Sequence, residues 1–202
     1  MGFLLNNCTF APLNVTTLQN CNSFDCDHND LNDFFVNDSI KWSNELLGKS
    51  YCFVLDEDPR QIVCAFTVSN DSIKTKLLPN SRGKKVSKDI PREKRLKSYP
   101  AVLIGRLGVN KKFRMLEGEE KSTGDQLMDF IKSWFINENN KTGCRFVVVD
   151  SYNEHRALRY YTRNDFSPLF STEEQEKEFT GLDLETELKT RMLFFDLILL
   201  TN

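Results

Sequence analysis

Apolar positions along this chain follow two spacings, one typical of strands and one typical of helices. Short apolar runs with the length and side chains of strands occupy 51–55, 61–69, 100–109 and 145–150. From Gly124 to about Asn137 the apolar residues instead recur at helical spacing, with Leu127, Met128, Ile131, Trp134 and Phe135 on one side. The order strand, loop, helix, strand, helix predicts one α/β domain over residues 1–202.

The flanking regions predict further elements. A helix is expected within 31–47, with Asn29 or Asp30 as its cap. The runs 51–55 and 61–69 are expected to form a hairpin, and the apolar run 191–200 to return into the sheet as a strand. Ser122 or Thr123 can cap the helix that begins near Gly124.

Composition narrows the class of protein. The chain has 202 residues, a net charge of -2 and 40% hydrophobic residues, as expected of a soluble globular domain with a sizeable core. Its six cysteines form no Cys-x-x-Cys pair and there are only two histidines, so we expect neither a zinc site nor a disulfide framework. We expect a reducing cytoplasm, no signal peptide and no membrane span.

Two segments carry candidate chemistry. The strand 100–109 leads through a basic stretch at 111–114 to the helix start Ser122-Thr123-Gly124, and backbone N–H groups at such a start bind anions. The second segment follows strand 145–150 and contains Asn153, Ala157, Tyr160, Tyr161 and Phe166. In the simpler interpretation, the first is a buried strand with a capped helix. Asn153 then caps a short helix, and Tyr160 and Tyr161 pack in the core.

These two segments together resemble the acetyl-coenzyme A core of the GNAT superfamily of N-acetyltransferases. The second matches the pattern Asn-x-x-x-Ala-x-x-Phe-Tyr-x-x-x-Gly-Phe, with Asp165 in place of the usual glycine. The resemblance implies an α/β (α+β) fold with a central mixed, largely antiparallel sheet, a splayed pair of strands and flanking helices. It places the cofactor core at about 100–166.

The resemblance also implies roles for individual residues. Tyr161 aligns with the tyrosine that protonates the coenzyme A thiolate, a role that suits a phenol because it is neutral at pH 7. Glu154 or Asp150 is a candidate to deprotonate the amine, and main-chain N–H groups near Gly108 and Val109 to stabilise the oxyanion. The residues implied to bind acetyl-coenzyme A are Leu107, Gly108, Val109, Arg114, Lys121, Ser122, Thr123, Gly124, Asp125, Asn153 and Tyr160.

The loop after the first strand departs from the family pattern. It is several residues longer than usual and carries Glu117, Glu119 and Glu120 where the pyrophosphate should approach. Three carboxylates within about a Debye length of a diphosphate would repel it. Either residues 115–120 project outward and leave 121–124 as the phosphate nest, or cofactor binding is weak or lost.

A basic segment at 74–97 holds ten lysines and arginines against two acids, and Pro79, Gly83 and Pro91 prevent one regular helix there. Such a run is commonly a solvated face, but it can also bind a polyanion through counterion release. The candidate nucleic-acid contacts are Lys84, Lys85, Arg92 and Arg95.

Together with the segment 24–34 and the strand pair, this basic segment makes residues 20–170 resemble the acetyltransferase toxins of bacterial toxin–antitoxin pairs. That branch acetylates the α-amine of aminoacyl-tRNA and is inhibited by an antitoxin protein. The sequence leaves open a small amine, a protein terminus or lysine as acceptor. It also leaves open a catalytically inactive binding module with the same fold.

Overall fold

The computed structural model of the protein describes residues 2–90 and 98–201. It divides into two compact units, one formed by Met1–Ser69 and Ile104–Ser133 and the other by Asn70–Leu103 and Trp134–Asn202. Each unit is therefore built from two separate stretches of the chain. The strand order is β1-β2-β3-β4-β5-β7-β6, and β3 and β4 each contribute residues to both units.

The first unit contains the predicted hairpin and the two predicted helices, together with elements before residue 21 that were not predicted. The strands are β1 (Cys8–Pro12), β2 (Lys49–Leu55), the first part of β3 (Ile62–Ile73) and the end of β4 (Tyr99–Val109). The helices are α1 (Phe3–Asn7), α2 (Val15–Asn20), α3 (Asn29–Asp33), the π-helix η1 (Phe34–Asp38), α4 (Ser39–Asn44), the 3-10 turn η3 (Lys111–Phe113) and most of α6 (Thr123–Ile136).

β2 and β3 pair antiparallel with Phe53 opposite Cys64, and a bulge follows between Phe53 and Val54. β1 joins the other edge of β2, with Phe10 opposite Phe53. The core on one side of these strands includes Phe24, Phe34 and Phe35, which come from the segment between α2 and α4. This segment therefore contributes the helices α3 and η1 to the first unit and also side chains to its hydrophobic core.

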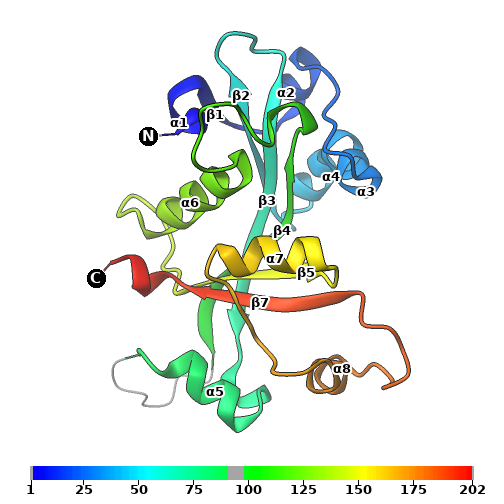
Figure 1. The fold of residues 1–202 in the computed structure, drawn as a ribbon, viewed down its shortest axis with the longest axis vertical. Coiled ribbons are helices and arrows are strands. Elements are labelled where there is room, and N and C mark those ends of the chain that lie inside the picture. Colours follow the sequence, from blue (N-terminus) through cyan, green and yellow to red (C-terminus); the bar gives the residue numbers. More distant parts are fainter. Residues whose placement is uncertain (1, 91–97, 202) are drawn as a thin grey trace. The chain divides into compact units, whose positions relative to one another are not determined.

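The second unit is built around two long antiparallel strands, β5 (Phe146–Tyr152) and β7 (Thr190–Asp196), in register with Asp150 opposite Met192. The short strand β6 (Ser167–Pro168) pairs with the other edge of β7. Helix α7 (His155–Arg163) packs on β5, and α8 (Glu173–Thr180) contacts β7 (Figure 1). The remaining elements are the 3-10 turns η2 (Thr75–Leu77) and η4 (Leu197–Leu200) and helix α5 (Asn80–Ser87).

Several predicted elements are confirmed with changed ends. The helix expected within 31–47 is capped one residue earlier than predicted, because His28 Nδ1 accepts the Leu31 N–H at 3.4 Å. That helix also changes pitch, since Phe34–Asp38 is a π-helix. The strand expected over 191–200 ends at Asp196, where the Asp196 carboxylate accepts the Ile198 N–H at 3.2 Å and starts a 3-10 turn.

Candidate functional site

The end of strand β4 is held closely against its surroundings in the first unit. Gly108 is buried, and a Cβ added there would lie 3.2 Å from both the Cys26 Sγ and the Phe24 ring. After Val109 the strand is fixed to β3, because the Asn110 N–H donates to the Val63 carbonyl at 2.9 Å and its side chain donates to the Ile62 carbonyl at 3.1 Å. Glycine therefore allows the close approach of Phe24 to the strand, which a larger residue could keep only if Phe24 or Cys26 shifted, and the sequence alone could not give this signal.

A continuous group of aromatic side chains follows this segment. Phe24 contacts Phe35 at 5.4 Å between ring centroids, Phe35 contacts Phe34 at 5.6 Å, and Phe34 contacts Trp42 at 6.1 Å. Arg106 of β4 packs on this group, with its guanidinium carbon 4.2 Å from the Phe34 centroid. The predicted cofactor strand is therefore covered by side chains of residues 24–42.

The basic residues that follow β4 form ion pairs. Lys111 Nζ lies 2.6 Å from an Asp25 carboxylate oxygen, and Arg114 Nη1 lies 3.1 Å from Asp27. Arg114 also donates from Nη2 to the Cys26 carbonyl at 2.5 Å. Lys111 and hydrogen bonds from Asn32 and the Asp27 N–H hold the pKa of Asp25 down at about 2. Arg114 was predicted to bind acetyl-coenzyme A, but neither its counterion Asp27 nor Asp25, the counterion of Lys111, was among the predicted site residues.

The long loop closes on itself. The Thr123 N–H donates to the Arg114 carbonyl at 3.1 Å, and the Thr123 hydroxyl donates to the Phe113 carbonyl. These hydrogen bonds join the two ends of the loop formed by residues 115–122. Within it Glu119 accepts hydrogen bonds from the Phe3 N–H at 3.1 Å and from the Gln126 amide at 3.0 Å. One of the three carboxylates is therefore bound to other parts of this unit, while Glu117 and Glu120 are exposed.

The start of helix α6 is capped as the sequence predicted. The Ser122 hydroxyl oxygen accepts the Asp125 N–H at 3.2 Å and donates to the Asp125 carboxylate at 2.6 Å. Lys121 forms an ion pair with Asp129 at 2.6 Å. Gly124 is buried in the first turn. The residues 121–125 thus make a well-ordered helix start whose cation already has a carboxylate partner.

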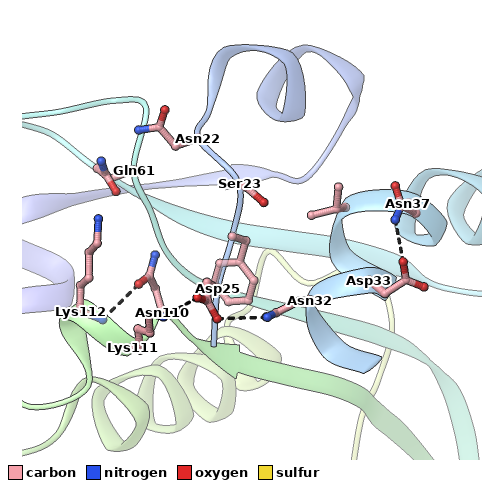
Figure 2. A pocket seen from close by; sticks show the side chains of 12 residues that line it. Asn22, Ser23, Asp25, Asn32, Asp33, Asn37, Gln61, Asn110, Lys111 and Lys112 are labelled. Carbon is pink, nitrogen blue, oxygen red and sulfur yellow. Dashed lines mark hydrogen bonds and ion pairs between the residues drawn. The ribbon is translucent and has the colours of Figure 1, made fainter. Parts of the chain in front are cut away.

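A polar pocket of about 670 Å³ lies beside this region in the first unit (Figure 2). Its walls come from the segment before α3, from α3 and η1, from the residue before β3 and from the residues that follow β4. They are Asn22, Ser23, Phe24, Asp25, Asn32, Asp33, Val36, Asn37, Gln61, Asn110, Lys111 and Lys112. Figure 2 shows the Asp25 carboxylate hydrogen-bonded to Asn32. Lining amides were not among the predicted site residues.

In the second unit, Asn153 is bound to the protein itself. Its side-chain amide donates to a Glu173 carboxylate oxygen and to the Leu188 carbonyl, each at 2.9 Å. The alternative that Asn153 caps the following helix is wrong, because α7 begins at His155 with Glu154 as its N-cap residue, and no side chain caps it. Asn153 instead ties the end of β5 to the segment around α8.

Tyr161 lies on α7 and its ring contacts two other aromatic rings. Its ring centroid is 5.0 Å from that of Tyr160 and 5.4 Å from that of Phe166. Burial, followed by the negative charge of Asp150 on β5, raises the pKa of Tyr161 well above its usual range. The phenol therefore stays protonated at every pH at which the protein would work, as a proton donor requires.

Asp150 is the second titratable group of this region. Desolvation, followed by the charge of Asp71 at the end of β3, raises the pKa of Asp150, although the side chain still reaches solvent. Environments that raise the pKa of a carboxyl group favour its use as a proton acceptor near neutral pH. Asp150, one of the two predicted bases, therefore has surroundings suited to accepting a proton.

The basic segment contributes exposed cations to the second unit. Lys84 and Lys85 lie exposed on α5, near its C-terminus, while Arg92 and Arg95 fall outside the described residues. Arg82 of the same helix instead donates to the carbonyls of Pro168 and Leu169 and has a structural role.

Two further observations concern metal and membrane. Within residues 2–90 and 98–201 no three histidine, cysteine or acidic side chains gather into a group able to hold a metal ion. None of the helices described is both long and apolar enough to cross a bilayer.

Neither a protein-family model nor a curated protein sequence matches this chain. Solved structures do match it along nearly its whole length. AtaT complexed with acetyl-methionyl-tRNAfMet is 21% identical, with a TM-score of 0.62 over 97% of this chain and 100% of that chain. A tyrosine-to-phenylalanine variant of KacT is 17% identical (TM-score 0.62, 97% and 98%). AtaTR bound with acetyl-CoA is 20% identical (TM-score 0.60, 98% and 99%). The chain therefore has the GNAT fold of the AtaT and KacT acetyltransferase toxins.

Proposed function

We propose that this protein is an N-acetyltransferase that moves an acetyl group from acetyl-coenzyme A directly to a primary amine, and that its acceptor is the α-amine of aminoacyl-tRNA. The observation that carries the proposal is Tyr161, a phenol on α7 of a GNAT fold whose pKa is raised by burial and by the negative charge of Asp150, so that it stays protonated. The solved neighbours support the acceptor, since one of them is AtaT complexed with acetyl-methionyl-tRNAfMet.

The residues divide the proton transfers between them. Asp150 takes a proton from the amine as the amine attacks, because the raised pKa of this carboxyl group makes it a better base than an ordinary aspartate. Tyr161 gives a proton to the departing sulfur, because the phenol is not ionised at neutral pH and still carries its proton. Main-chain N–H groups near Gly108 and Val109 stabilise the negative charge that develops on the carbonyl oxygen.

Acetyl-coenzyme A, when bound, supplies an activated acetyl thioester and a diphosphate that needs positive surroundings. The residues 121–125 fit the diphosphate as a capped helix start, and the contacts of Glu119 with Phe3 and Gln126 hold one carboxylate in place within the unit. The other residues proposed to bind the cofactor are Leu107, Gly108 and Val109 of the first unit and Asn153 and Tyr160 of the second unit. A metal ion has no part in the proposal.

One observation favours a second candidate, a GNAT-fold binding module without activity. Lys111 and Arg114, the cations that follow β4, already have the counterions Asp25 and Asp27. If these pairs do not open, Lys111 and Arg114 contribute no free positive charge to diphosphate binding. A small amine or a protein amine remains the alternative acceptor for an active enzyme.

Mass spectrometry of the acceptor tests the proposal. The protein is incubated with acetyl-coenzyme A and, in parallel, with aminoacyl-tRNA, an amino-acid amide and a lysine-containing peptide. An acetyl group on the α-amine of aminoacyl-tRNA supports the full proposal. Acetylation of only the amide or the peptide overturns the acceptor but keeps the enzyme, and no acetylation of any of them favours the binding module. As protein partner we propose an antitoxin, because AtaT is found bound to the C-terminus of the antitoxin AtaR.

A further inference from the structure

The guanidinium of Arg106 is held by two aromatic rings. Its central carbon lies 4.2 Å from the centroid of the Phe34 ring and 5.6 Å from that of Trp42. Phe34 belongs to the π-helix η1 and Trp42 to α4, and their rings pack edge to face at 75°. Contacts of this kind orient a guanidinium plane without using its N–H groups.

Arg106 differs in its electrostatics from the other well-placed cations of the first unit. Lys111, Arg114 and Lys121 each have a carboxylate within ion-pair distance. Arg106 has none among the described residues, and its N–H groups donate to no described acceptor. A partly buried guanidinium whose donors are unused in the protein is suited to bind an oxyanion of a ligand, because its planar fork matches phosphate and carboxylate.

The position of Arg106 along β4 favours a contact with the acceptor. Residues 106 and 108 of a strand face the same side of a sheet, and on that side Gly108 meets Phe24 while Arg106 meets Phe34. The side chain therefore lies on the covered face of β4, two residues before the main-chain groups proposed to stabilise the oxyanion.

We infer that Arg106 is a recognition residue for the acceptor and binds a phosphate group that lies near the amine to be acetylated. The inference rests on the proposed function and narrows the acceptor to phosphate-bearing amines, of which aminoacyl-tRNA is one. The charge-assisted fork contributes affinity for the acceptor and takes no part in the proton transfers. A carboxylate on the acceptor is the alternative source of the same oxyanion.

Steady-state kinetics with three acceptors separates these sources. Wild type, Arg106→Lys and Arg106→Gln are compared with aminoacyl-tRNA, the free amino acid and the amino-acid amide, at saturating acetyl-coenzyme A. We expect both variants to raise KM for aminoacyl-tRNA about tenfold or more with a small change in kcat, and to change KM for the amide by less than about twofold. Arg106→Lys keeps the positive charge but loses the planar guanidinium, so a rise in KM in this variant reports the loss of the two-point contact rather than of the charge.

Three outcomes would overturn the inference: an unchanged KM for aminoacyl-tRNA, an equal loss with the amide, or a loss with the free amino acid alone, which would assign a carboxylate. Arg60→Lys is the matched control, because Arg60 is an exposed arginine of the same unit paired with Asp58. Trp42→Leu removes one supporting ring and keeps the arginine, and a smaller rise in KM is expected from it. Circular dichroism and acetyl-coenzyme A affinity show whether each variant folds.

A binding measurement keeps the inference separate from the proposed function. Aminoacyl-tRNA affinity is measured across a salt series for wild type and Arg106→Gln without turnover. Loss of one phosphate contact should weaken binding and reduce the salt slope by about one. If wild type acetylates nothing, the proposed function fails while this slope still tests Arg106. If the affinity and slope of the variant equal those of wild type, the inference about Arg106 is wrong.

Discussion

The backbone N–H of Phe166 donates to the carbonyl oxygen of Tyr161 at 3.0 Å, and the rings of the same two residues lie 5.4 Å apart. The Asp165 N–H donates to the Thr162 carbonyl, also at 3.0 Å, and Asp165 itself is left-handed, with φ 64°. This is a Schellman ending of α7 with its usual apolar contact. The hydrogen bond and the ring contact of this helix end therefore fix the position of Tyr161, the proposed proton donor.

Replacing Asp165 by glycine should stabilise the protein. A left-handed backbone costs a residue with a Cβ about 1 kcal/mol, and the extra freedom of glycine in the unfolded chain offsets about half of that. We expect the free energy of unfolding to rise by about 0.5 kcal/mol in chemical denaturation. Asp183→Gly is the control, because Asp183 is exposed and not left-handed, and there we expect a loss. A loss at Asp165 as well would mean that its side chain stabilises the turn.

Replacing Tyr161 by phenylalanine should lower kcat about 10²-fold, as expected when a general acid is lost. The ring contacts with Tyr160 and Phe166 do not need the hydroxyl, so the fold and acetyl-coenzyme A affinity should be retained. Initial rates and calorimetry on the same preparation measure both. A variant with the turnover of wild type would exclude Tyr161 from the proton transfer.

The acid limb of the pH profile should depend on Asp71. Asp150 must be ionised to accept a proton, so kcat/KM rises as the pH passes upward through its pKa, which Asp71 raises. Asp71→Asn lowers that pKa, and the limb should move to lower pH by less than about one unit.

Kinetics on one acceptor across the pH range measure this shift. Asp150→Asn should remove the limb together with most of the rate, whereas Asp183→Asn should leave it in place. An acid limb that stays fixed in Asp71→Asn and survives in Asp150→Asn would assign the base to another group.

Replacing Gly108 by alanine should destabilise the first unit. The new methyl group would lie 3.2 Å from the Phe24 ring and from Cys26 Sγ, so strand or ring must shift, at a cost of about 1–3 kcal/mol. Gly105→Ala on the same strand is the matched control, because a Cβ there meets nothing within 4 Å. The free energy of unfolding from denaturation curves and the affinity for acetyl-coenzyme A should both fall in Gly108→Ala, and neither should fall in Gly105→Ala. Equal stability of the two variants would show that the Phe24 ring moves aside at little cost in free energy.

Apolar runs predicted β2, β3, β4, β5 and β7, and the helical spacing predicted α6, because burial of apolar side chains sets both patterns; the short strands β1 and β6 were not predicted. The Ser122 cap was also predictable, since capping depends on neighbours in sequence. The partners of the predicted site residues were not: Asp27 is 87 positions from Arg114, and Glu173 is 20 from Asn153. The only sequence sign of the left-handed backbone at Asp165 is that the family pattern has glycine at this position. The two rings that contact Arg106 could not be predicted from the residues next to it in the sequence.

Calorimetric titration with acetyl-coenzyme A tests the central claim most directly, because every step proposed for Asp150 and Tyr161 requires that this molecule bind. The proposal predicts one site per chain with a dissociation constant in the micromolar range, as expected for a working cosubstrate, and the same constant for Tyr161→Phe. No heat of binding up to millimolar concentration would contradict it and leave a GNAT-fold module whose loop cations stay paired with Asp25 and Asp27.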